Sequence, residues 1–160
     1  MQRYVLSIIV DNHAGVLSRV TGLFSRRGYN IESLSVGETE NPAVSRITVS
    51  VICDAGVIDQ IRKQVEKLVD VREIKELSPN ASVYRELALI KVAVSSQNRI
   101  EVIGIVDIFR AEVVDVAPNS VTIEITGDEG KISAFVTLME PYGVISIART
   151  GLTGLSRGLS

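Results

Sequence analysis

Residues 4–28 read YVLSIIVDNHAGVLSRVTGLFSRRG and contain three patterns in succession. The first seven, 4–10, are almost entirely apolar and have the length of a strand. Polar and small residues interrupt this run at 11–15, as they do in turns and at helix starts. From Val16 onward, apolar side chains recur at the spacing of one helix face, until Gly28 marks a helix end. The stretch therefore predicts a strand, a turn and an amphipathic helix.

The residues that follow extend this pattern to six elements. A strand is predicted at 31–36, and strict alternation of apolar and polar residues predicts another at 45–53. A second amphipathic helix follows Asp54, and residues 71–77 form the last strand, which gives the order β-α-β-β-α-β. The apolar faces of the two helices are Val16, Val20, Leu23 and Phe24 in the first, and Val57, Ile58, Ile61, Val65 and Leu68 in the second.

The same order of elements repeats after a short linker at 78–82. We therefore expect an α+β fold of two tandem ferredoxin-like domains, residues 1–78 and 79–160. The strands of the second domain are expected at 87–94, 112–117, 121–126 and 144–148. The helices between them present Val102, Ile105, Val106 and Phe109, and Ile132, Phe135, Val136 and Met139.

Right-handed crossovers place both helices of each half on one face of its sheet and leave the other face open. The first strand is nonetheless apolar on both sides, with Leu6, Ile8 and Val10 on one and Val5 and Ile9 on the other. At ~25 cal/mol per Å² of apolar surface, exposing such side chains would cost several kcal/mol. We expect sheet-to-sheet packing or dimerisation to cover this face.

Composition excludes several classes of function. The 160 residues carry 17 Lys and Arg against 19 Asp and Glu, a net charge of −2, and only 4% are aromatic. A nucleic-acid-binding surface needs a basic patch or aromatic stacking platforms, so neither DNA nor RNA is an expected partner. No long uncharged span or amino-terminal signal pattern is present, which predicts a cytoplasmic protein that does not bind membranes.

The chain is also poor in groups that carry chemistry, with one histidine and one cysteine. His13 is either a general base or, more simply, a solvated residue of a turn. Cys53 falls on the apolar side of the alternating strand, where a small buried hydrophobe is expected. No pair of residues has the spacing of a metal site, so we expect neither catalysis nor metal binding.

The turn at 11–15 is the most informative polar segment. A helix start presents unpaired backbone N–H groups and a positive dipole end, which suit a carboxylate. Gly15 allows a ligand to approach the backbone closely. Asn12 offers both a donor and an acceptor, as the ammonium and carboxylate groups of an amino acid require. The alternative is that these residues simply cap the helix.

Two longer segments carry a resemblance to a known family. Residues 11–20 (DNHAGVLSRV) and 23–34 (LFSRRGYNIESL) closely resemble an ACT domain, specifically that of the acetolactate synthase small subunits. The resemblance covers nearly the whole chain, although its matches in the second half are shorter. The further matching segments are 45–46, 67–71, 85–87, 108–110, 148–151 and 155–158.

The resemblance implies a regulatory subunit without chemistry of its own. Such a subunit activates a separate catalytic subunit that depends on thiamine diphosphate, and it confers feedback inhibition by valine. Thiamine diphosphate, Mg and FAD would belong to the catalytic subunit, and none to this chain. Two copies would pair their ACT domains side by side as a homodimer, with valine at the seam. An ACT-type amino-acid sensor for another enzyme, or for a transcription regulator, is the alternative.

The resemblance also assigns residues to the valine site. One subunit would contribute Asn12 and the backbone from Ala14 to Leu17, and the neighbouring subunit Asn30 and Ile31. Asn30 has an alternative role, because asparagine tolerates the left-handed backbone that often follows a helix. Apolar walls would come from Val16, Leu17, Ile31 and Leu34.

Two features of the second half remain open. Four arginines are candidates for contact with the catalytic subunit, although each is equally compatible with a solvated surface position. The segment 151–160 has too few large side chains to fold alone, so we expect it to be frayed or docked on a partner. The four arginines are Arg85, Arg110, Arg149 and Arg157.

Overall fold

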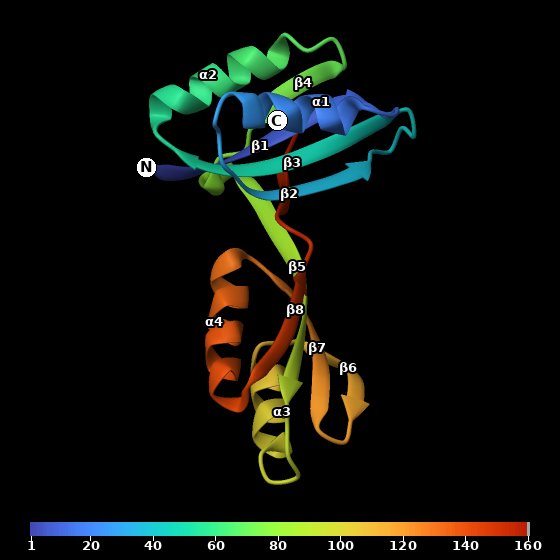
Figure 1. Ribbon diagram of the computed structural model, residues 1–160, viewed down its shortest axis with the longest axis vertical. Coiled ribbons are helices and arrows are strands. Elements are labelled where there is room, and N and C mark those ends of the chain that lie inside the picture. The colour runs from blue at the N-terminus through green and yellow to red at the C-terminus, as the bar shows by residue number, and fades with distance from the viewer. Residues whose placement is uncertain (160) are drawn as a thin grey trace. The chain divides into compact units, whose positions relative to one another are not determined.

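The computed structural model describes residues 1–159 and divides into two compact units (Figure 1). The first comprises Met1–Tyr84 together with the chain from Leu152 onward, and the second comprises Arg85–Gly151. This division differs from the expected domains 1–78 and 79–160 in assigning the carboxyl-terminal residues to the first unit. Of these residues, Ser160 lies outside the described part of the chain.

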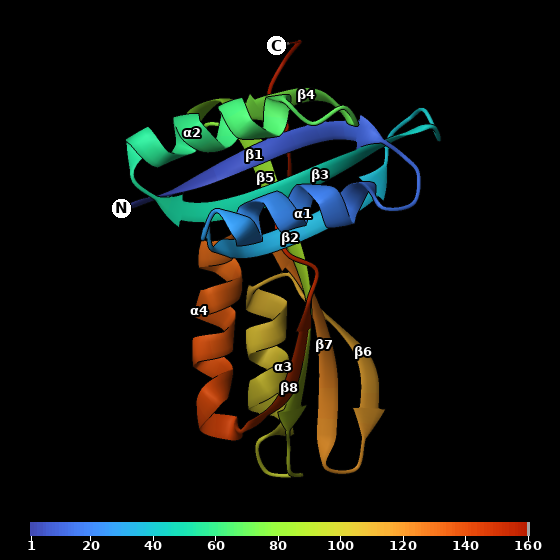
Figure 2. The same ribbon diagram turned by 45° about the horizontal axis from the view of Figure 1, so that its top comes forward.

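The first unit has the expected β-α-β-β-α-β order. Its sheet is arranged β2-β3-β1-β4, and every neighbouring pair is antiparallel. Both helices lie on one face of the sheet, as the crossover rule requires (Figure 2). The elements are β1 (Gln2–Asp11), α1 (Val16–Arg26), β2 (Ile31–Glu38), β3 (Val44–Cys53), α2 (Ala55–Glu66) and β4 (Val71–Glu76).

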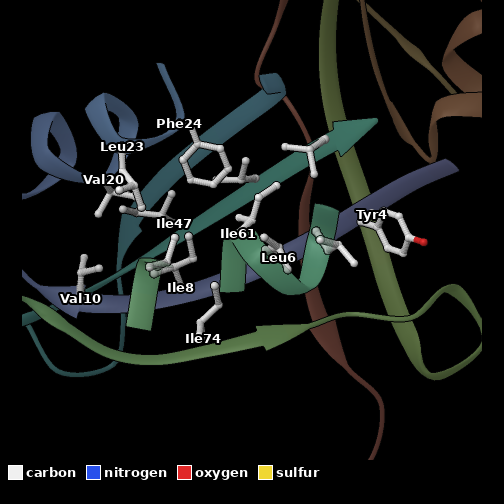
Figure 3. Close-up of a cluster of buried hydrophobic side chains, with 14 of the residues drawn as sticks. Tyr4, Leu6, Ile8, Val10, Val20, Leu23, Phe24, Ile47, Ile61 and Ile74 are labelled. Atoms are coloured by element: carbon white, nitrogen blue, oxygen red, sulfur yellow. The ribbon is translucent and has the colours of Figure 1, made fainter. Parts of the chain in front are cut away.

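The core of the first unit fills the space between these helices and the sheet (Figure 3). Leu6, Ile8 and Val10 project from β1 into it, as their alternation predicts. Cys53 at the end of β3 is buried in the same core, which confirms its expected role. The predicted helix faces are confirmed too: Val16, Val20, Leu23, Phe24, Ile58, Ile61 and Val65 are buried, and Val57 and Leu68 pack against them.

On the opposite face of this sheet, the chain itself covers Val5. Val5 is buried there against Leu77 and Leu152, with Tyr84 beside them. The carboxyl-terminal strand β9 (Thr153–Ser156) pairs with β5, which begins at Ser82 after the short helix η1 (Pro79–Ala81). The sequence correctly predicts that Val5 needs a cover, but the structure provides one from within the same chain.

Hydrogen bonds secure this carboxyl-terminal segment to the first unit. The Ser35 hydroxyl donates to the Leu152 carbonyl oxygen at 2.9 Å, and the Leu152 N–H donates to the Ser33 hydroxyl at 3.3 Å. Lys75 Nζ donates to the Ser156 hydroxyl at 3.3 Å. The expectation of a frayed or partner-docked tail is therefore wrong for residues 152–156.

The second unit repeats the motif with sheet order β6-β7-β5-β8. Phe135 is buried in its core, and the partly buried Phe109 packs against it edge to face, with ring centroids 5.3 Å apart. None of the helices within residues 1–159 combines the length and hydrophobicity that crossing a membrane requires. The elements are β5 (Ser82–Ala93), α3 (Arg99–Ile108), β6 (Glu112–Ala117), β7 (Ser120–Gly127), α4 (Glu129–Met139), η2 (Glu140–Tyr142) and β8 (Val144–Arg149).

Candidate functional site

The start of α1 presents a group of unpaired backbone donors. Gly15 occupies the N-cap position with φ of 88° and ψ of −14°, a left-handed conformation that favours glycine. Within residues 1–159, no acceptor binds the N–H groups of Ala14, Gly15, Leu17 or Ser18. The first turn of the helix contains no acidic residue. These donors at the positive end of the helix dipole suit a carboxylate.

Asn12 lies beside this helix start and is held by the connection between β2 and β3. Its backbone N–H donates to the Ala43 carbonyl oxygen at 2.9 Å. Its Nδ2 donates to the Pro42 carbonyl oxygen at 2.8 Å and to Glu38 Oε1 at 3.3 Å. The described residues donate no hydrogen bond to Asn12 Oδ1, which leaves an acceptor suited to an ammonium group. Asn12 does not cap α1, so the capping alternative is wrong for this residue.

The two apolar residues that begin α1 differ in their surroundings. Val16 is 3% exposed and belongs to the core, and its backbone N–H already donates to the His13 carbonyl oxygen at 3.4 Å. The Leu17 side chain is 41% exposed and lies on the open side of the helix. Ile31 and Leu34, the other predicted wall residues, are partly buried against the core. Leu17 is therefore the side chain that α1 itself can offer to an apolar ligand group.

Asn30 and Ile31 lie at the other end of α1 from Gly15. The helix has 11 residues and so separates the two groups by about 16 Å at 1.5 Å per residue. A single chain does not bring them together, and the assignment of these groups to different subunits stays a prediction. Asn30 does not adopt the left-handed backbone that was its alternative role; Gly28, with φ of 72°, does so instead.

A cluster of charged side chains adjoins the helix start, and sequence reasoning missed it. The Asp70 side chain, 10% exposed, lies 2.6 Å from Arg19 and 3.3 Å from His13, measured between carboxylate oxygen and ring or guanidinium nitrogen. Asp11 pairs with Arg72 at 2.6 Å. His13 thus has an ionic neighbour rather than solvent alone. No sequence signal links Arg19 to Asp70, because 51 residues separate them.

Three members of this cluster also have the residue types of metal ligands. One ligand atom each from Asp11, His13 and Asp70 lies within 4.8 Å of the others. Both carboxylates are already paired with guanidinium groups, those of Arg72 and Arg19. A cation would have to compete with these two fixed positive charges, so the arrangement favours an ion-pair network over a metal centre.

Two of the candidate partner-binding arginines have distinctive settings in the second unit. The Arg149 guanidinium pairs with the Glu86 carboxylate, whose side chain is 7% exposed. Arg149 is therefore a structural residue of this unit. Arg110 is exposed and has φ of 54°, which is the left-handed region and unusual for a residue with a side chain. Arg110 thus remains a candidate for an external contact.

Two family profiles match the chain, one in each half. The family profile described as an AHAS small subunit-like ACT domain matches residues 6–73. The profile described as the small subunit of acetolactate synthase matches residues 85–158. The charged cluster and the helix start both lie within the first match, whereas the second match includes the segment that returns to the first unit.

Relatives match over nearly their full lengths. The probable acetolactate synthase small subunit of Methanothermobacter thermautotrophicus is 47% identical over 97% of this chain and 93% of its own. The isozyme 3 small subunit of Escherichia coli is 45% identical over 98% and 96%, respectively. The crystal structure of the Thermotoga maritima small subunit is 40% identical, with a TM-score of 0.93 and complete coverage of both chains. The chain belongs to the acetolactate synthase small subunit family.

Proposed function

We propose that this chain is the regulatory, non-catalytic subunit of a cytoplasmic acetolactate synthase. It activates a catalytic subunit that depends on thiamine diphosphate, and it makes that enzyme sensitive to valine. Family membership over both units supports the regulatory role and favours it over a sensor for another enzyme or a transcription regulator. Thiamine diphosphate, Mg and FAD belong to the catalytic subunit in this proposal.

The observation that carries the valine proposal is the helix start. The unpaired N–H groups of Ala14, Gly15, Leu17 and Ser18 provide donors for the carboxylate of an amino acid. Asn12 Oδ1 provides an acceptor for its ammonium group. The exposed Leu17 side chain provides an apolar contact for a branched side chain. One site therefore has complementary groups for all three parts of valine.

The second half of the site comes from another copy of the chain. β2 is an edge strand of the first unit, so one side of its backbone is open to pairing within the described residues. Pairing of two copies along this edge would extend the sheet and bring Asn30 and Ile31 of one copy to the ligand of the other. Sedimentation equilibrium at micromolar concentration should show a dimer, and a well-behaved monomer would contradict this arrangement.

Regulation follows from linkage. If valine favours one arrangement of the paired subunits and the catalytic subunit prefers another, valine binding lowers activity without touching the active site. A coupling free energy of ~1–3 kcal/mol is enough for a 5- to 150-fold change in affinity. The chain itself needs no catalytic group for this role.

The test combines calorimetry with an activity assay. L-valine should bind the purified chain, whereas L-valinamide, which lacks the carboxylate, should bind at least about tenfold more weakly, a loss of ~1.4 kcal/mol. The chain alone should form no acetolactate from pyruvate, but it should raise the activity of the catalytic subunit, and L-valine should reverse this. Turnover by the isolated chain, or equal binding of both ligands, would overturn the proposal.

A further inference from the structure

We propose that Asp70 is a positioning residue of the effector site and that it acts through Arg19. The proposal rests on the function proposed above and adds to the effector site a residue that was not among its predicted members. Asp70 precedes β4, far along the chain from the helix start, yet it contacts both the loop and the first turn of α1. Its contacts account for how the unpaired donors are held in place.

Asp70 joins three segments of the first unit. Its backbone carbonyl oxygen accepts the N–H of Asp11 at 2.9 Å, which ties down the end of β1. Its carboxylate Oδ2 accepts from Arg19 Nε and lies within reach of Arg19 Nη2, both at 2.6 Å. Its Oδ1 lies 3.3 Å from His13 Nε2, in the loop itself. The end of β1, the loop and α1 therefore all contact this one residue.

Burial makes the contact with Arg19 specific. The Asp70 side chain is 10% exposed, and a buried carboxylate needs hydrogen-bonded partners of opposite charge. Two donors of one guanidinium on a single oxygen restrict both the position and the orientation of Arg19. The Arg19 side chain is 49% exposed, so without this contact it would be free to move.

Arg19 in turn contacts the glycine that begins α1. Its backbone N–H donates to the Gly15 carbonyl oxygen at 3.0 Å and closes the first turn of the helix. Its side chain folds back over that turn, so that Nη1 lies 3.0 Å from the place where a Cβ on Gly15 would be. Arg19 thus lies against the loop that carries the unpaired N–H groups.

Charge explains why Asp70 is needed. A cation in the first turn of a helix is unfavourable, because the helix dipole is positive there. The Asp70 carboxylate offsets this repulsion and keeps the Arg19 guanidinium beside Gly15. Without it, Arg19 would leave the helix start, and the loop would lose both the contact of His13 with Asp70 and the contact of Gly15 with Arg19. The N–H groups would then no longer converge on one carboxylate.

The experiment measures the affinities of L-valine and L-valinamide for the full-length wild-type chain and for the Asp70→Asn, Arg19→Gln and doubly substituted chains. Asp70→Asn should weaken L-valine binding about tenfold, and it should lower the preference for L-valine over L-valinamide by a similar factor. The double variant should resemble either single variant, because both changes remove the same positioned group. Asp11→Asn, which breaks the neighbouring pair with Arg72, is the matched control and should keep the wild-type preference.

The outcomes separate this inference from the proposed function. If the wild-type chain binds no L-valine, the proposed function fails. If the wild-type chain binds L-valine and Asp70→Asn, folded by circular dichroism, keeps the same preference over L-valinamide, the positioning role fails. A loss of stability alone would weaken the binding of both ligands equally and leave the ratio of their affinities unchanged. That result would also overturn the positioning role. Additive effects in the double variant would exclude action through Arg19.

Discussion

The Ser35 hydroxyl in β2 donates a hydrogen bond to the carbonyl oxygen of Leu152 at 2.9 Å, although 117 residues separate the two. This contact connects the edge strand of the first unit to the last segment of the chain. The Leu152 side chain is buried against Val5 and Leu77 at the same place. The carboxyl-terminal segment is thus part of the packing of the amino-terminal unit.

Leu152→Ala should destabilise the first unit by about 2 kcal/mol, because it removes a buried side chain and leaves a cavity beside Val5. Urea denaturation followed by circular dichroism measures the loss. Leu155→Ala is the control, since Leu155 lies in the same strand but is 58% exposed, and it should change stability by less than about 0.5 kcal/mol. Equal effects of the two substitutions would show that the segment is not packed as described.

Gly15→Ala should destabilise the chain by about 1–2 kcal/mol and weaken valine binding. The new Cβ would meet Arg19 Nη1 at 3.0 Å in a left-handed backbone conformation. Gly22→Ala is the matched control in the same helix, where a Cβ comes no closer than 3.7 Å to Arg26 Nη1. It should raise stability by up to about 1 kcal/mol. Thermal unfolding and calorimetry with L-valine measure the two effects; an unchanged affinity in Gly15→Ala would contradict the site.

Arg110 allows backbone strain to be separated from side-chain contact. With φ of 54°, Arg110→Gly should be about 1 kcal/mol more stable than Arg110→Ala, because only glycine adopts this conformation without cost. Thermal unfolding of the two variants measures the difference. If the guanidinium contacts the catalytic subunit, both variants should activate that subunit equally poorly. Equal stability of the two variants would exclude strain at this position.

Arg149→Ala should destabilise the second unit by about 2–4 kcal/mol, because it leaves the Glu86 carboxylate buried without its counter-charge. The double change Arg149→Ala with Glu86→Gln should recover part of this loss, since the remaining amide is neutral. Chemical denaturation of the three proteins measures the series. An unaltered stability in Arg149→Ala would indicate that Glu86 finds other compensation.

Cys53 should resist alkylation in the folded chain. Burial raises the pKa of its thiol, and the neighbouring Asp54 carboxylate raises it further. The reactive thiolate is therefore scarcer at pH 8 than for a free cysteine, and access to it is blocked as well. Mass spectrometry after iodoacetamide treatment should show little modification in buffer and complete modification in denaturant. Rapid modification of the native chain would contradict the burial of Cys53.

Local patterns in the sequence predict most of the fold. The apolar spacing from Val16 to Phe24 identifies the inward face of α1, and the alternation at 45–53 identifies the strand β3. The expectation that this strand is buried on one side only is wrong, because its polar residues Thr48 and Ser50 are buried as well. The left-handed Gly15 and the open helix start are also local features. These features can be predicted from the sequence because the residues that form each of them are close together in the chain.

Contacts between distant segments escape this kind of reasoning. The strand Thr153–Ser156 consists of small and polar residues around one leucine, and its partners are supplied only by the folded first unit. Asp70 cannot be identified from the sequence either, because its proposed positioning role depends on its contact with Arg19 and on its burial, which arise only in the folded unit. The opposite ends of α1 also separate Gly15 from Asn30, so one half of the proposed site depends on a second copy of the chain.

The return of the chain at Leu152 makes the second unit an insertion within the first. A fragment cut after residue 78 would therefore lack part of its own fold and would expose Val5 and Leu77 to water. Excising 85–151 and joining Tyr84 to Leu152 with a short turn would instead keep the first unit complete, because Gly154 already packs against Tyr84. Dissection of this subunit should follow spatial rather than linear boundaries.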